Sequence, residues 1–218
     1  MKKVVLFQLI MVFVAFGCTQ AEIPGDVEAE DYKSYLLDAY LDSLIADSAV
    51  VAADTAEINN LLFMREEEKL AHDVYITLYD KWGFRVFNNI SNSEQRHTEA
   101  VLTLLDYYGI EDVVNDNPLG VFVNGDLQAL YDTLVDKGSI SEIEALKVGA
   151  LIEEVDIADL EKELALTDKD PIITVYSNLL MGSENHLRAF VRNLNRWGVV
   201  YEPQVLDTDA YNSIIFGD

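Results

Sequence analysis

Apolar residues recur at steps of three and four along four long segments of the sequence. This spacing places them on one face of an α-helix, and no segment sustains the apolar–polar alternation of a half-buried strand. The expected helices cover residues 55–81, 85–108, about 139–166 and 170–197. After residue 54, proline and most of the glycines lie at or near the junctions between them. The pattern therefore predicts an all-α fold built on a four-helix bundle.

The connection between the second and third of these helices is long. It begins with a loop over residues 115–125, which contains Pro118 and other turn formers. A shorter helix is expected to follow over residues 126–137, because its apolar residues keep the helical spacing. The sequence therefore predicts a bundle with a short extra helix in the middle crossover.

The C-terminal end differs in composition from the bundle. Residues 199–218 contain Pro203 and are expected to form an extended tail over the bundle. The predicted domain covers residues 55–205, and residues 206–218 are its tail.

The N-terminal segment has the features of a secretory signal. Lys2 and Lys3 precede an apolar run that ends at Cys18 and is short for a membrane span. The junction resembles a bacterial lipoprotein cleavage site, at which the cysteine is acylated. Residues 1–17 would then be removed, residues 19–54 would form a tether with a short helix, and the protein would be lipid-anchored or secreted at the cell envelope. The alternative is an ordinary cleaved signal with an incidental cysteine.

Charge and cysteine content exclude several classes of function. The chain has 39 acidic and 15 basic residues and a formal net charge of -24, so nucleic acid is not an expected partner. A single cysteine excludes a disulfide framework and a cysteine-based zinc cluster. Any metal site must therefore be built from carboxylates and the three histidines.

Each predicted apolar stripe is interrupted near its middle by polar residues, most of them of metal-ligand type. The interruptions are Glu68 in the first helix, Glu94 and His97 in the second, Glu153 in the third, and Ser183 and His186 in the fourth. An ionised carboxylate inside a bundle costs several kcal/mol unless it is paired. Converging carboxylates therefore indicate cations between them, and two metal ions bridged by carboxylates, each with one imidazole, would satisfy the set.

A surface interpretation of the same acids stays open. Glu66, Glu67 and Glu68 are consecutive, so some of them are expected in solvent. Glu154 also competes with Glu153 for the inward position.

Four segments carry a family resemblance. They are residues 64–75 (MREEEKLAHDVY), 93–97 (SEQRH), 149–157 (GALIEEVDI) and 182–190 (GSENHLRAF). They resemble the ferritin-like family catalogued as domain of unknown function 2202, and the resemblance covers roughly residues 55–205. The layout is also similar to the rubrerythrin and erythrin branch of the ferritin-like superfamily. In that branch two irons are held by Glu on the first helix, Glu-x-x-His on the second, Glu on the third and Glu-x-x-His on the fourth.

The resemblance implies a set of metal ligands in this chain. They are Glu68, Glu94, His97, Glu153 and His186, with Asp156 as a further candidate. It also places Tyr75 near the metals, as a candidate catalytic one-electron donor or simply as a core aromatic. The pattern departs at Ser183, where a glutamate is expected, and Asp156, Glu154 or water stay open as its replacement. His72 is expected at the surface or beside the ligands.

The implied chemistry is that of a dimetal redox site. Carboxylates and imidazoles without thiolate suit iron or manganese, so two iron ions, or manganese, are the expected cofactors. The resemblance implies ferroxidase, peroxidase or oxygen-scavenging activity, with metal ions and small oxidants as partners. A metal-storing or metal-scavenging protein and a lipid-tethered helical interaction module with a degenerate site stay open as alternatives. So does assembly into a homodimer.

Overall fold

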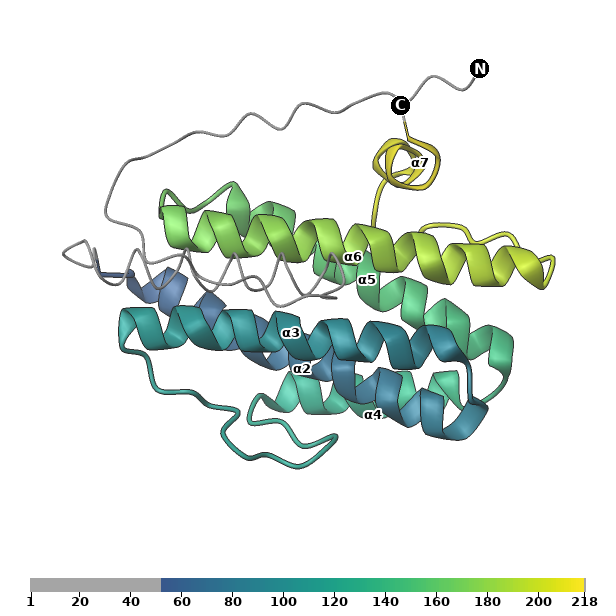
Figure 1. Cartoon of the computed structure of the whole chain (residues 1–218), viewed down its shortest axis with the longest axis horizontal. Coiled ribbons are helices and arrows are strands. Elements are labelled where there is room, and N and C mark those ends of the chain that lie inside the picture. Colours follow the sequence, from purple (N-terminus) through teal and green to yellow (C-terminus); the bar gives the residue numbers. More distant parts are fainter. Residues whose placement is uncertain (1–51, 218) are drawn as a thin grey trace, which may run out of the picture.

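The computed structural model describes residues 52–217, which form helices and connecting loops without a strand (Figure 1). The helices are α2 (Thr55–Trp82), α3 (Arg85–Tyr108), α4 (Gly125–Gly138), α5 (Glu142–Leu164), α6 (Asp170–Arg196) and α7 (Thr208–Phe216). The all-α prediction is confirmed, including the short helix in the crossover. The predicted signal segment, Cys18 and most of the predicted tether lie outside the described residues.

Local sequence signals explain where the long helices begin and end. The Asp54 side chain accepts hydrogen bonds from the backbone N–H groups of Ala56 and Glu57, and the Glu57 side chain accepts from the Asp54 N–H. This capping box satisfies donors that the first turn of α2 leaves free. Gly83 ends the helix with a φ of 71°, a left-handed conformation that glycine adopts without strain. The next helix, α3, has the predicted bounds.

The prediction of an extended C-terminal tail is wrong. A non-helical segment over residues 199–207 leads into α7. The side chain of Asp207 caps this helix by accepting hydrogen bonds from the N–H groups of Asp209 and Ala210. Nine residues are too few for a stable isolated helix, so the burial of Tyr211 and Ile214 against the rest of the protein must contribute. Sequence periodicity over so short a segment does not reveal such packing.

The four long helices pack as two antiparallel pairs. α2 packs mainly against α3, and α5 mainly against α6, with short connections within each pair. Contacts between α3 and α6 and between α2 and α5 join the pairs, while α4 covers α2 and α5 from outside (Figure 1). α7 lies against α6. None of the helices in residues 52–217 carries an apolar stretch long enough to cross a membrane.

A polar layer divides the apolar core in two. One cluster of buried apolar residues surrounds Phe87 and Phe190, and a second surrounds Leu104 and Tyr176. On α2, α3 and α6 the polar interruption of the predicted stripe lies between residues of the two clusters, and on α5 Glu153 lies between Ile152 and Ile157 of the first cluster. The four helices therefore bring their polar residues together at one level of the bundle.

The three consecutive glutamates of α2 are all buried, so the expectation that some of them are solvated is wrong. Their exposed fractions are 3% for Glu66, 7% for Glu67 and 1% for Glu68. The reason is that α2 is covered by α3, α4 and α5 and by the loop that precedes α4. Glu66 accepts hydrogen bonds from that loop, from the N–H groups of Val123 at 2.5 Å and Asn124 at 2.9 Å.

Candidate metal centre

Five side chains of metal-ligand type meet in the polar layer. They are Glu68 from α2, Glu94 and His97 from α3, Glu153 from α5 and His186 from α6, and each is at most 9% exposed. Glu94 and His97 are three residues apart, so they project from the same face of α3. The structure thus brings together the five residues that the stripes and the resemblance single out. That they bind metal stays a prediction.

Glu94 lies between the two histidines. Its Oε2 is 2.8 Å from Nδ1 of His97, and its Oε1 is 2.7 Å from Nδ1 of His186. The two imidazole rings are nearly parallel, with centroids 5.4 Å apart. The two oxygens of one carboxylate therefore serve different histidines.

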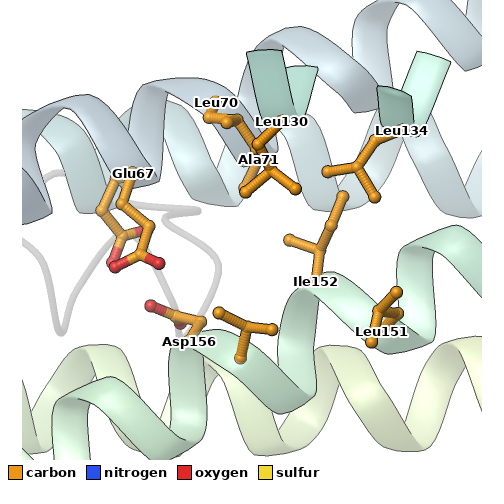
Figure 2. Close-up of a pocket in the computed structure, with 10 residues that line it drawn as sticks. Glu67, Leu70, Ala71, Leu130, Leu134, Leu151, Ile152 and Asp156 are labelled. Atoms are coloured by element: carbon orange, nitrogen blue, oxygen red, sulfur yellow. The ribbon is translucent and has the colours of Figure 1, made fainter. Parts of the chain in front are cut away.

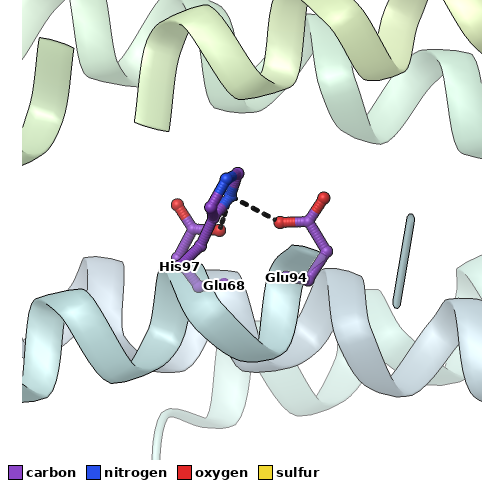
Figure 3. Close-up of side chains that lie close together, drawn as sticks. All are labelled: Glu68, Glu94 and His97. Atoms are coloured by element: carbon purple, nitrogen blue, oxygen red, sulfur yellow. Dashed lines mark ion pairs between the residues drawn. The ribbon is translucent and has the colours of Figure 1, made fainter. Parts of the chain in front are cut away.

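Glu68 and Glu153 complete two groups of ligand atoms. Glu68 Oε2 is 3.3 Å from Nδ1 of His97, and Glu153 Oε2 is 3.4 Å from Nδ1 of His186. Figure 3 shows Glu68 and Glu94 both directed towards His97. Within each group the ligand atoms lie within 4.8 Å of one another, and Glu94 belongs to both. The structure therefore contains two adjacent groups of candidate ligand atoms that share one carboxylate.

Many of these facing atoms are buried without a hydrogen-bond partner. They are both carboxylate oxygens of Glu68, Oε1 of Glu94, and Nδ1 of His97 and of His186. The nitrogen and oxygen atoms approach closely, but their angles do not make hydrogen bonds. A buried polar atom without a partner costs about 1–3 kcal/mol, and such atoms are rare in folded proteins. Cations among these lone pairs would remove that cost, so the residues present fit a pair of metal ions.

Tyr75 contacts the centre through Glu153. Its hydroxyl donates a hydrogen bond to Glu153 Oε1 at 2.5 Å, which leaves Oε2 directed towards His186. Burial, followed by the charge of Glu153, raises the pKa of Tyr75 well above its usual value. The phenol therefore keeps its proton and orients the carboxylate.

Asp156 lies beside the two groups of ligand atoms and outside both. Ser183, which occupies the position where the resemblance expects a glutamate, donates a hydrogen bond to Oδ2 of Asp156. Oδ1 of Asp156 is buried and has no partner. The carboxylate that approaches this part of the centre thus comes from α5, and a serine on α6 holds it.

Glu154 is directed away from the centre, unlike its neighbour Glu153. It accepts hydrogen bonds from the hydroxyl of Tyr201 at 2.6 Å and from the N–H groups of Gln204, Val205 and Leu206 at 2.9 Å each. It therefore anchors the segment that leads to α7, and the choice between Glu153 and Glu154 is decided by what packs on each side of α5.

Gly182 lets α6 pack closely against the imidazole of His97. A Cβ atom on Gly182 would lie 2.6 Å from Nε2 of His97, so only glycine lets α6 approach this ring. Sequence reasoning missed Gly182, although a glycine inside a helix costs about 1 kcal/mol relative to alanine and is itself a signal.

His72 Nδ1 lies 2.8 Å from Asp73 Oδ1, and His72 belongs to neither group of ligand atoms.

Burial and mutual charge shift the proton affinities of the centre. Burial lowers the pKa of His186, but Glu94 and Glu153 outweigh it and raise that pKa to about 10. The pKa of His97 is raised in the same way by Glu94 and Glu68. Burial raises the pKa of Glu68 to about 8. For Glu94 burial acts upward, but His97 and His186 prevail and hold its pKa well below the usual range.

We expect the metal-free protein to lose stability as pH rises from about 5 to about 9. Folded Glu68 keeps its proton up to a pKa of about 8, against 4.5 in the unfolded chain, and folded His186 keeps its proton up to about 10, against 6.5. Over this range the folded state binds more protons than the unfolded state, so the free energy of unfolding falls as pH rises. Thermal unfolding of chelator-treated protein across this range measures the slope.

Added salt and one variant separate this effect from repulsion between surface charges. Salt at about 0.5 M screens exposed charges and leaves the buried centre largely unaffected. Glu68→Gln removes one titrating group and is expected to flatten the lower part of the profile. A midpoint that rises with pH in the metal-free protein would contradict the prediction.

Comparisons with known proteins find a matching family model and a similar protein that has a solved structure. Residues 57–218 match the family model described as "Uncharacterized protein domain (DUF2202)". The chain is 54% identical over 159 residues to "Uncharacterized protein MJ0754" of Methanocaldococcus jannaschii, covering 73% of this chain and 86% of that protein. It is also similar to the crystal structure of hypothetical protein MJ0754 from Methanococcus jannaschii, with a TM-score of 0.75 and 50% identity over 78% of this chain and 97% of that one. The chain therefore belongs to the DUF2202 family.

Proposed function

We propose that this protein is a ferritin-like dimetal protein that uses a pair of iron or manganese ions in redox chemistry with peroxide or dioxygen. One observation carries the proposal: the two oxygens of buried Glu94 face two different histidines, among buried oxygen and nitrogen atoms that have no hydrogen-bond partner. One ion would be held by Glu68, Glu94 and His97, and the other by Glu94, Glu153 and His186.

The donor set supports the choice of metal. Carboxylates and imidazoles without thiolate suit iron and manganese. The order of ligands along the chain agrees with the rubrerythrin and erythrin pattern, apart from Ser183. At that point Asp156, held by Ser183, is the carboxylate that would complete the set.

Two bound and reduced metal ions would supply two electrons. With two protons, these electrons convert one hydrogen peroxide molecule to two water molecules. Residues of this chain hold the candidate ligands in place and keep bulk water away from them. Tyr75 holds Glu153 by a hydrogen bond, and Ser183 holds Asp156. The two apolar clusters on either side of the polar layer exclude bulk water, so charges in the layer interact more strongly than in solvent.

Metal analysis followed by peroxide consumption tests the proposal. Protein purified anaerobically and reconstituted with ferrous iron is expected to contain about two irons per chain and, once reduced, to consume peroxide. Glu94→Ala and His97→Ala are expected to lose this activity, while His72→Ala retains it because His72 is in neither group. Absence of metal after reconstitution would rule out a metal function. Equal peroxide consumption in all variants would rule out chemistry at this centre.

Metal storage or scavenging is the second candidate. The net charge of -24 attracts cations to the protein, and this favours storage. Two bound irons per chain without peroxide consumption would support storage over catalysis. Acylation of Cys18 would place either activity at the cell envelope, and mass spectrometry of the mature N-terminus tests that part.

A further inference from the structure

A cavity of about 90 Å³ lies between α2, α4 and α5 (Figure 2). Its walls are aliphatic side chains, among them Ala71, Leu134, Ile152 and Val155. Leu130 also lines it and is 39% exposed, so the cavity is closest to solvent on the α4 side.

The other end of the cavity is formed by acidic residues. Glu67 and Asp156 point towards one another there (Figure 2), and Glu68, the next residue of α2, also lines the cavity. Oε2 of Glu67, both oxygens of Glu68 and Oδ1 of Asp156 are buried without hydrogen-bond partners. Because Glu68 also faces His97, the cavity adjoins the candidate metal centre.

Ordinary core packing does not account for this space. Protein interiors are close-packed, and the side chains around a void lose the dispersion contacts that a neighbour would supply. Water does not fill the aliphatic part of the cavity well, because those walls offer it no hydrogen bonds. An engineered aliphatic cavity of about 150 Å³ stays dry and binds benzene or xenon. This cavity is smaller, so its size and walls suit a small apolar molecule.

We propose that the cavity admits dioxygen and holds it beside the candidate metal centre. The inference rests on the proposed function and selects dioxygen, rather than peroxide, as the oxidant that uses this cavity. Away from the acidic end, the aliphatic walls that make up most of the cavity offer hydrogen peroxide no hydrogen-bond partner, whereas dioxygen needs none. If two ferrous ions were bound at the centre, one electron from each and two protons from water would reduce dioxygen to hydrogen peroxide and leave two ferric ions.

Xenon tests the cavity without any metal. Crystals of the metal-free protein held under xenon gas are expected to show one xenon atom among Ala71, Leu134 and Val155. Val155→Phe fills the cavity and is expected to abolish that binding. Leu164→Phe is the matched control, because Leu164 is a partly buried residue of the same helix that does not line the cavity. Absence of xenon from the unaltered protein, or ordered water in its place, would overturn the proposal.

Oxidation rates of the ferrous-loaded protein provide the second measurement. In Val155→Phe the ratio of the rate with dioxygen to the rate with peroxide is expected to fall by about tenfold, because the larger side chain fills the cavity that Glu68 shares with the candidate metal centre. Leu164→Phe is expected to keep the ratio of the unaltered protein. Equal slowing with both oxidants would overturn the proposal. If Val155→Phe does not fold, Leu130→Trp, at the solvent end, replaces it in both measurements.

The two proposals fail in different ways. Xenon binding in a protein that takes up no iron would refute the metal function and leave an apolar ligand site. Two bound irons without xenon would refute the cavity proposal and leave the metal function standing.

Discussion

Glu94→Ala is expected to abolish binding of both metal ions, whereas Glu68→Ala and Glu153→Ala are each expected to weaken one. Glu94 is the only residue shared by the two groups of ligand atoms among residues 52–217, and its two oxygens face different histidines. We expect both dissociation constants to rise by about 100-fold or more, since even residues behind the ligands change metal affinity by about 10–100-fold. Calorimetric titration with manganese and metal analysis after iron reconstitution measure the effect.

Controls separate a lost ligand from a lost fold. Glu94→Gln keeps the shape of the side chain and removes its charge, so it is expected to weaken both sites while the helical circular dichroism stays unchanged. His72→Ala is expected to bind two ions, because His72 pairs with Asp73 and faces neither group. One tightly bound ion remaining in Glu94→Ala would show that Glu94 does not bridge the two sites.

Glu154→Ala is expected to lower the free energy of unfolding by about 3–5 kcal/mol while leaving metal binding unchanged. Glu154 is fully buried and accepts hydrogen bonds from Tyr201 and from three consecutive backbone N–H groups. Each buried donor left without an acceptor costs about 1–3 kcal/mol, and partial exposure of the released segment reduces the total. Denaturant unfolding of the metal-free protein measures the change.

Two comparisons make this result specific. Glu161→Ala, an exposed glutamate on the same helix, is expected to change stability by less than about 0.5 kcal/mol. Glu153→Ala is expected to weaken the binding of one metal ion, which Glu154→Ala leaves unchanged. Loss of metal in Glu154→Ala under conditions where it stays folded would refute the separation of the two glutamates.

The long helices and the level of the polar layer were predictable from the sequence. Apolar residues at steps of three and four define the buried face of each long helix, and turn formers such as Gly83 and Gly109 mark the ends of α2 and α3. Glu68, Glu94, Glu153 and His186 interrupt those faces, and helices that pack side by side bring such interruptions to one level. Local geometry alone contains this information.

Neighbouring elements decided the rest. Glu153 and Glu154 differ by about 100° around α5, and the sequence does not say that α6 lies beside one and the 201–206 segment beside the other. Likewise, α4 and its preceding loop help to bury all three glutamates of α2. Packing against the rest of the protein stabilises α7, whose residues were predicted to be extended. The sequence by itself therefore determined the helices and the set of candidate ligands, because their spacing is a property of the local chain. Only the tertiary structure decided which carboxylates share the centre, since that depends on residues distant in sequence and adjacent in space.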